Sequence, residues 1–177
     1  TLSRSTFTSN AGGFAAGWAL DTGSSYNTIL DVYAANPLGA SADIVNGANY
    51  NTVSQSTMIS SGAGAISGAF VFSASSQNVF TGNYVVNTNG IGLTMTSGSA
   101  GNTVSFSTIV ADALNTSALR LDASNGNTVM NSRMTSAAGY GLWVINGSRY
   151  NGISLSTMIS NSATNFGLYV VDSSSLD

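Results

Sequence analysis

The sequence predicts an all-β fold, a parallel β-solenoid of about seven three-strand coils with 24–27 residues per coil. One polar-then-apolar phrase recurs along the whole chain, and its clearest copy runs from Asn51 to Ser60. Apolar pairs spaced by two, the period of a strand, recur once in each copy. Glu and Lys are absent, and Gly, Ser, Thr and Asn fill the intervals, so the composition disfavours helices. Self-similarity at this period is typical of stacked repeat proteins.

A corner asparagine opens most copies of the phrase. The positions are Asn27, Asn51, Asn78, Asn102, Asn127 and Asn151, and their spacings are 24, 27, 24, 25 and 24 residues. We expect these residues to form a ladder, because each amide can bond its turn backbone and the like amides of neighbouring coils. Asparagine also tolerates the left-handed backbone that such corners require.

The first two strands of each coil follow the asparagine. The residues two and seven places after it are apolar throughout, as Val53 and Met58 show, and we expect both to point inward. Small polar residues five places after the asparagine should form a second ladder at the bend between these strands. Its members are Ser5, Ser56, Asn83, Ser107, Ser132 and Ser156, interrupted only by Val32.

The third strand is predicted from inward pairs such as Leu119/Leu121 and Leu142/Val144. The pair Asp43/Val45 departs from the pattern at its first member. The segments before this strand, 10–17, 37–42 and 60–68, vary most and are predicted to be outward loops. Coils stacked about 4.8 Å apart would form a body of roughly 34 Å. Stacking buries apolar faces that no single coil could bury.

The chain is expected to be a single domain, 1–177, cut from a longer array. Thr1 continues the phrase at its second place, and Asp177 falls 26 residues after Asn151, where the next asparagine is due. Such a segment exposes sheet edges at both ends. We therefore expect end-to-end self-association or contact with neighbouring repeats.

Composition restricts the class of partner and the location. Only 6% of residues are charged and the net charge is −3, so the chain has no basic footprint for nucleic acid. No apolar run is long enough to span a membrane, because a span needs roughly 20 residues. A surface of Ser, Thr, Asn and Gly is common in secreted fibrous proteins, and it predicts an extracellular or cell-surface location.

The phrase around Asn51, with Ser56 and Met58, and the Gly-Leu-x-Val segments at Gly141 and Gly167 resemble the right-handed parallel β-helix superfamily, the pectin-lyase-like solenoids. The resemblance covers essentially all 177 residues and implies right-handed coils. This superfamily includes pectate lyases, polygalacturonases, epimerases, phage tailspikes and surface adhesins. The resemblance therefore implies a fold rather than one activity.

The chemistry available to a catalytic site is sparse. The chain has no His, Cys or Lys, which removes most nucleophile and base arrangements. Pectate lyases need clustered carboxylates for calcium and polygalacturonases need several Asp, whereas Asp21, Asp122 and Asp172 occupy similar turns in separate coils. We predict no catalytic, metal or cofactor site. Asp31 lies in register with Arg4, which predicts a surface ion pair worth no more than about 1 kcal/mol.

The predicted function is a non-catalytic structural or adhesive segment, such as a stalk, adhesin shaft or fibre. The alternative is a carbohydrate-binding or polysaccharide-processing domain, in which Arg120, Trp143 and Tyr169 contact a glycan or a partner from one sheet face. An ice-binding surface is a weaker alternative. It would use an outward threonine file, Thr1, Thr28, Thr52, Thr103 and Thr128, which Val79 and Gly152 interrupt.

Overall fold

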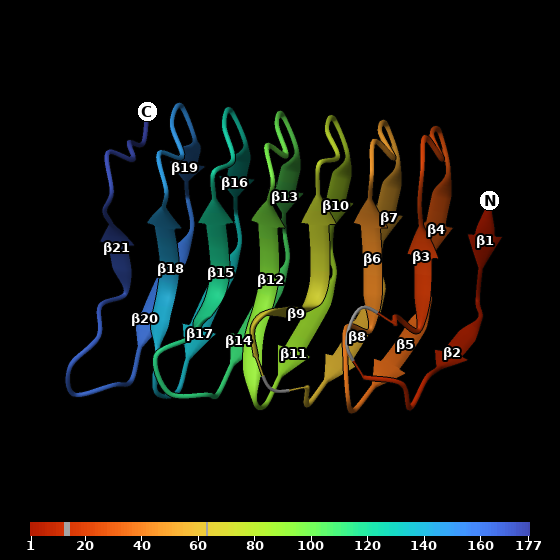
Figure 1. The fold of residues 1–177 in the computed structure, drawn as a ribbon, viewed down its shortest axis with the longest axis horizontal. Coiled ribbons are helices and arrows are strands. Elements are labelled where there is room, and N and C mark those ends of the chain that lie inside the picture. The colour runs from red at the N-terminus through yellow and green to blue at the C-terminus, as the bar shows by residue number, and fades with distance from the viewer. Residues whose placement is uncertain (13–14, 63) are drawn as a thin grey trace.

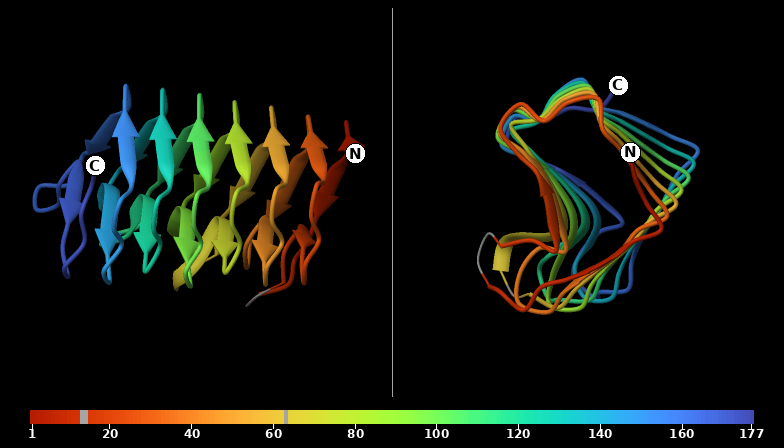
Figure 2. Two further views of the ribbon diagram at one scale, coloured as in Figure 1. Left: turned by 90° about the horizontal axis from the view of Figure 1, so that it is seen from above. Right: turned by 90° about the vertical axis from the view of Figure 1, so that its right-hand side faces the viewer.

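The computed structural model describes residues 1–12, 15–62 and 64–177, and all its regular elements are β-strands. Three seven-stranded parallel sheets run along the axis of a β-solenoid, and each coil contributes one strand to each sheet (Figure 1). The two termini lie at opposite ends of the stack, and in end view the coils follow one another around a common outline (Figure 2). The predicted fold class is confirmed.

The sheets are named in the order in which the chain enters them. The first sheet contains β1 (Leu2–Ser3), β4 (Thr28–Leu30), β7 (Thr52–Ser54), β10 (Val79–Thr81), β13 (Thr103–Ser105), β16 (Thr128–Met130) and β19 (Gly152–Ser154). The second sheet contains β2 (Thr6–Thr8), β5 (Tyr33–Asn36), β8 (Thr57–Ser60), β11 (Tyr84–Asn87), β14 (Thr108–Ala111), β17 (Arg133–Ser136) and β20 (Thr157–Ser160). The third sheet contains β3 (Trp18–Leu20), β6 (Ala42–Val45), β9 (Gly64–Ser73), β12 (Gly90–Thr96), β15 (Ser117–Asp122), β18 (Tyr140–Ile145) and β21 (Leu168–Val170).

A continuous apolar column fills the solenoid. Val53 and Met58 are fully buried, which confirms that the residues two and seven places after the asparagine point inward. Phe70, Phe72 and Phe80 pack against one another with ring centres 4.7–6.3 Å apart, and they form the bulkiest part of this core. The inward side chains of all the coils belong to one hydrophobic cluster, so the core extends from one coil to the next along the axis.

The register of the third sheet differs from the prediction in the second coil. Trp18 is in register with Ala42, and Leu20 with Ile44, so the inward pair in the second coil is Ala42/Ile44 rather than Asp43/Val45. Both residues of this pair are fully buried. The prediction chose the pair that contains Val45, shifted by one residue, because Val45 is larger and more apolar than Ala42. The inward pattern therefore has no exception in this coil, and Asp43 lies in the outward file.

Two predicted loops overlap strands, since β6 begins at Ala42, the last residue of the segment 37–42. β9 begins at Gly64, inside the segment 60–68, because Gly64 pairs with Gly90 of β12 before the register shifts between Gly90 and Ile91. Gly68 lies close to neighbouring backbone, since a Cβ there would come within 2.6 Å of the Phe70 carbonyl oxygen. This close approach explains why a glycine occupies position 68 of the long strand β9.

The corner asparagines form a hydrogen-bonded ladder along the stack. In each step, the backbone nitrogen and Nδ2 of one asparagine donate to Oδ1 of the next, over 2.8–3.2 Å. From Asn51 onward, Nδ2 also donates to a turn carbonyl of the preceding coil, as from Asn51 to Ser24. Asn51, Asn78, Asn102, Asn127 and Asn151 are fully buried.

The left-handed backbone does not lie at the asparagines themselves, as the sequence had suggested. The residue before each asparagine adopts it, for example Tyr50 with φ 57° and Tyr150 with φ 57°. A second left-handed file lies at the corner between the first and second sheets. Its members are Arg4, Asp31, Gln55, Gly82, Phe106, Asn131 and Leu155. Each asparagine is thus placed by its neighbour's conformation and keeps its own amide free for the ladder.

Candidate functional site

The predicted contact residues Arg120, Trp143 and Tyr169 lie next to one another on the outward face of the third sheet. Arg120 of β15 is in register with Trp143 of β18, which is in register with Tyr169 of β21. The guanidinium carbon of Arg120 lies 5.2 Å from the centre of the Trp143 ring. The ring centres of Trp143 and Tyr169 are 6.4 Å apart. The three side chains form a cation–π contact that continues into an aromatic row.

Two further aromatic residues, which the sequence reasoning missed, complete this row. Tyr140 lies 5.0 Å from Trp143 and stacks on Tyr169 at 5.1 Å with an interplanar angle of 12°. Phe166 stacks on Tyr169 at 5.6 Å and remains 57% exposed. Tyr140 and Phe166 each stand three residues before an outward aromatic, a spacing that could have indicated them. We call Arg120, Tyr140, Trp143, Phe166 and Tyr169 the aromatic stack.

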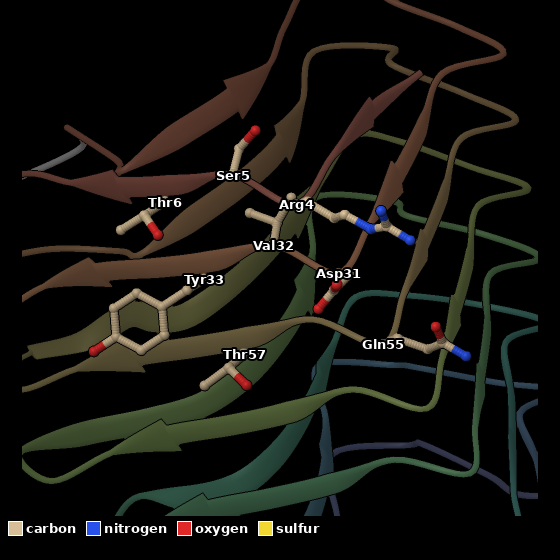
Figure 3. A pocket seen from close by; sticks show the side chains of 8 residues that line it. All are labelled: Arg4, Ser5, Thr6, Asp31, Val32, Tyr33, Gln55 and Thr57. Carbon is tan, nitrogen blue, oxygen red and sulfur yellow. The ribbon is translucent and has the colours of Figure 1, made fainter.

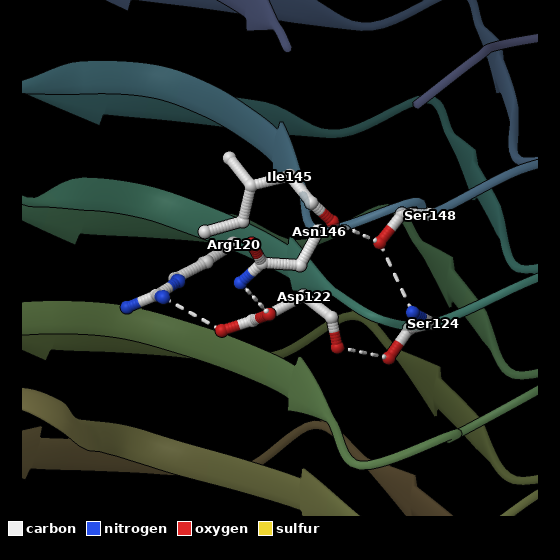
Figure 4. Close-up of polar contacts among 6 residues, drawn as sticks. All are labelled: Arg120, Asp122, Ser124, Ile145, Asn146 and Ser148. Atoms are coloured by element: carbon white, nitrogen blue, oxygen red, sulfur yellow. Dashed lines mark hydrogen bonds and ion pairs between the residues drawn. The ribbon is translucent and has the colours of Figure 1, made fainter. Parts of the chain in front are cut away.

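A polar network anchors one end of the aromatic stack (Figure 4). Nη2 of Arg120 lies 2.6 Å from Oδ2 of Asp122, and Nδ2 of Asn146 donates to Oδ1 of Asp122 at 2.7 Å. The side chains of Arg120 and Asp122 are only 14% and 18% exposed. Both carboxylate oxygens of Asp122 therefore accept hydrogen bonds within the protein, and the guanidinium is bonded to a carboxylate and packed on a ring. The network stabilises the turn after β15.

The same turn device occurs near the other end of the solenoid. Nδ2 of Asn46 donates to Oδ1 of Asp21 at 2.7 Å. This hydrogen bond, helped by those from Thr22, lowers the pKa of Asp21 below its ordinary value. Asp172 is not equivalent to these two residues, because it follows Val170 by two places, as Asn146 follows Val144 in the paired strand. The predicted similarity of Asp21, Asp122 and Asp172 holds only for the first two.

A groove of about 400 Å³ lies at the corner between the first and second sheets in the first three coils (Figure 3). We call it the corner groove, and its lining includes Arg4, Thr6, Asp31, Tyr33, Gln55 and Thr57. The predicted Arg4–Asp31 ion pair is wrong, since the only ion pair among the described residues joins Arg120 to Asp122. Figure 3 shows the Arg4 side chain extending to one side of the Asp31 carboxylate. The strand register places the two residues side by side at the corner, but it does not determine the direction in which their side chains point.

Asp43 is a buried carboxyl on the outward file of the third sheet, in register with Ala19 and Val71. The residue is 8% exposed, and its Oδ1 has no hydrogen-bond partner. Burial raises the pKa of Asp43 to about 7. The carboxyl is therefore protonated in the folded state at pH values where an unfolded chain has already lost the proton.

This shift predicts a pH-dependent stability. The folded pKa of Asp43 lies above the unfolded value of about 3.9, so the folded protein holds the extra proton between these values. The free energy of unfolding should fall as pH rises from about 4 through about 7. Asp43→Asn should remove this loss and stabilise the protein above pH 7 by at most about 4 kcal/mol, with little effect near pH 4. Urea unfolding across this range measures the change.

The exposed Asp112 provides the matched control for this substitution. Asp112→Asn removes an exposed carboxylate and leaves the buried Asp43 in place, so the free energy of unfolding of this variant should keep the pH dependence of the parent chain. Identical pH dependence in the parent and in Asp43→Asn would contradict the assignment to Asp43.

The described residues form neither a metal-ligand cluster nor a membrane-spanning helix. In the part of the chain that the structure describes, no three His, Cys, Asp or Glu side chains gather as metal ligands. Over the same residues, no helix is long and apolar enough to cross a bilayer.

One comparison with known proteins finds a match. The family model described as "Periplasmic copper-binding protein (NosD)" matches residues 22–168, which is most of the chain. No curated protein and no solved structure matches significantly.

Proposed function

The chain belongs to the NosD family, a periplasmic family of parallel β-helix proteins, and from this premise we propose that it is a non-catalytic structural or adhesive segment of a β-solenoid. The periplasmic description of the family agrees with a location outside the cytoplasm at the level of the cell envelope. In our proposal the segment serves as a stalk, an adhesin shaft or a fibre. Catalytic turnover of a polysaccharide by the purified chain would contradict it.

The asparagine ladder is the observation that carries this proposal. Five consecutive ladder steps join six coils through asparagine side chains, five of which are fully buried, in addition to the backbone bonds of three sheets. Buried amides bonded in both directions hold each coil in register and resist shear between coils. A body tied in this way keeps its shape and length, which are the properties that a spacer or shaft requires.

Copper has no part in the proposed role, because the side chains of this chain do not fit a copper site. Copper in proteins is bound mainly by His, Cys and Met. The chain has neither His nor Cys. Met58, Met95 and Met134 are fully buried in the apolar core, and Met158 packs against it. The fifth methionine, Met130, is partly exposed on β16, and its register neighbours are Ser105 and Ser154, so no second copper ligand of these types stands beside it. The match to the family model therefore supports the coil architecture and not the metal.

Carbohydrate binding by the aromatic stack is the second candidate function. The exposed ring of Phe166 favours it, because one face packs on Tyr169 while 57% of the side chain remains accessible. Exposed aromatic faces are suited to the apolar face of a sugar ring. The other members of the stack pack on one another, and this packing favours a structural role for them.

The proposed fibre role predicts self-association. The end coils leave Leu2, Phe7, Ile153 and Met158 only partly covered, next to strands with one free edge. Such edges pair with further strands. We expect the scattered-light mass of the purified chain to rise with concentration, in steps of one chain. A strict monomer at high concentration would contradict end-to-end assembly.

A further inference from the structure

We propose that the corner groove binds one neutral sugar unit of a polysaccharide. This inference rests on the proposed adhesive role and gives it a ligand class and a site. It places the sugar on the corner between the first and second sheets, away from the aromatic stack.

The polar side chains of the corner groove are not used by the fold. The side chains of Arg4, Asp31 and Gln55 make no hydrogen bond or ion pair within the described structure, although their backbones are fixed by the corner. Arg120 and Asp122 differ, because they bond each other and are mostly buried. The three side chains are exposed to solvent, so a ligand in the groove can replace the water bound to them without breaking a hydrogen bond of the fold.

The set of groups indicates the ligand chemistry. A guanidinium offers only donors, a carboxylate only acceptors, and an amide offers both. The charges of Arg4 and Asp31 cancel, so the groove does not favour an anion or a cation. Sugar hydroxyls each donate and accept, and a pair of adjacent hydroxyls can bond a carboxylate or a guanidinium in two-point fashion. A neutral sugar is therefore the ligand class that uses all three side chains.

Tyr33 adds the apolar part of the site. Its side chain is 41% exposed, and its neighbours in register on the second sheet are Thr6 and Thr57. Threonine is much smaller than tyrosine, so the phenol ring stands above both neighbours. An exposed aromatic ring beside hydrogen-bonding groups can contact the C–H face of a pyranose ring. The volume of about 400 Å³ lies within the range of roughly 300–1,000 Å³ that is usual for small-ligand sites.

The site is local to the first three coils. Further along the same corner file stand Gly82, Phe106, Asn131 and Leu155, which bring no charge. The corner backbone is left-handed at all of these positions, so the backbone geometry repeats while the chemistry does not. The backbone of this corner is the same in every coil and only the side chains differ, so these side chains are not needed to form the corner and are available for binding.

Binding to immobilised neutral oligosaccharides tests this inference, with the whole chain applied to cellohexaose, xylohexaose, mannohexaose and maltohexaose. We expect saturable binding to at least one of them. Asp31→Ala and Tyr33→Ser should each weaken it at least tenfold, a loss of about 1.4 kcal/mol. The matched controls Asp112→Ala and Tyr150→Ser alter an exposed carboxylate and an exposed tyrosine away from the groove and should bind as the parent does. Thermal unfolding of each variant checks that the fold is kept.

Three results would overturn the inference. The first is that none of the four oligosaccharides binds. The second is binding that survives in the groove variants and disappears in Trp143→Ala, which would assign the sugar to the aromatic stack. The third is saturable binding of free glycine with no sugar bound, which would make the ligand a zwitterion. Light scattering on the same samples separates the two proposals: a strict monomer that binds sugar through Asp31 supports the groove and contradicts only the fibre role.

Discussion

Replacing Asn102 with alanine should lower the free energy of unfolding by about 3–5 kcal/mol, since it leaves several buried polar groups unsatisfied. Oδ1 of Asn102 accepts from the backbone nitrogen and Nδ2 of Asn78, at 2.9 and 3.1 Å. Its Nδ2 donates to the Ser75 carbonyl at 2.9 Å and to Oδ1 of Asn127 at 3.2 Å. Alanine removes all four bonds in a place that water does not reach. Urea unfolding of the parent and the variant measures the loss.

Two other asparagines provide the controls for this experiment. Asn161 is exposed and lies outside the ladder, so Asn161→Ala should change stability by no more than about 0.5 kcal/mol. Asn27 begins the ladder and donates to Asn51 with no asparagine before it, so Asn27→Ala should cost less than Asn102→Ala. Equal small losses at all three positions would show that the ladder does not hold the coils together.

Phe72→Ala should cost about 3–5 kcal/mol, as is usual when a buried aromatic residue is truncated in a packed core. Phe72 is fully buried, and its ring centre lies 4.9 Å from that of Phe70 and 6.3 Å from that of Phe80. The loss combines the transfer of apolar surface with a cavity that rigid neighbouring coils cannot close. Chemical denaturation monitored by circular dichroism measures the change.

Phe106 is the matched control for Phe72. It is 66% exposed at the corner between the first and second sheets. Phe106→Ala should therefore lie within about 0.5 kcal/mol of the parent chain. Similar losses for Phe72→Ala and Phe106→Ala would contradict the assignment of the core to the inward files.

The fold could be predicted from the sequence because every coil repeats the same pattern of inward and corner residues. Inward positions such as Val53 and Met58 recur at a fixed distance from the asparagine, and that distance sets both the strand and its face. The single misplaced pair came from Ala42, whose size hides an inward position. The backbone conformation was misplaced by one residue, because Tyr50 rather than Asn51 takes the left-handed form.

The chemistry of the surfaces was less predictable, because it depends on side-chain direction rather than register. The register correctly placed Arg120, Trp143 and Tyr169 together, yet it also placed Arg4 beside Asp31, and only the first group is in contact. The partner of Arg120 is Asp122, two residues along its own strand, which no alignment of coils could reveal. Tyr140 and Phe166 reach the aromatic stack from the segments that precede the outward file.

The amide ladder also works as a ruler. Every step uses the same atoms and the same spacing, so a coil inserted or removed between two asparagines finds the same partners above and below. The length of such a protein can therefore change only by whole coils, in increments of about 4.8 Å. Reach and surface chemistry are then separate variables: the number of coils sets how far the body extends, while each outward side chain can change without altering that distance.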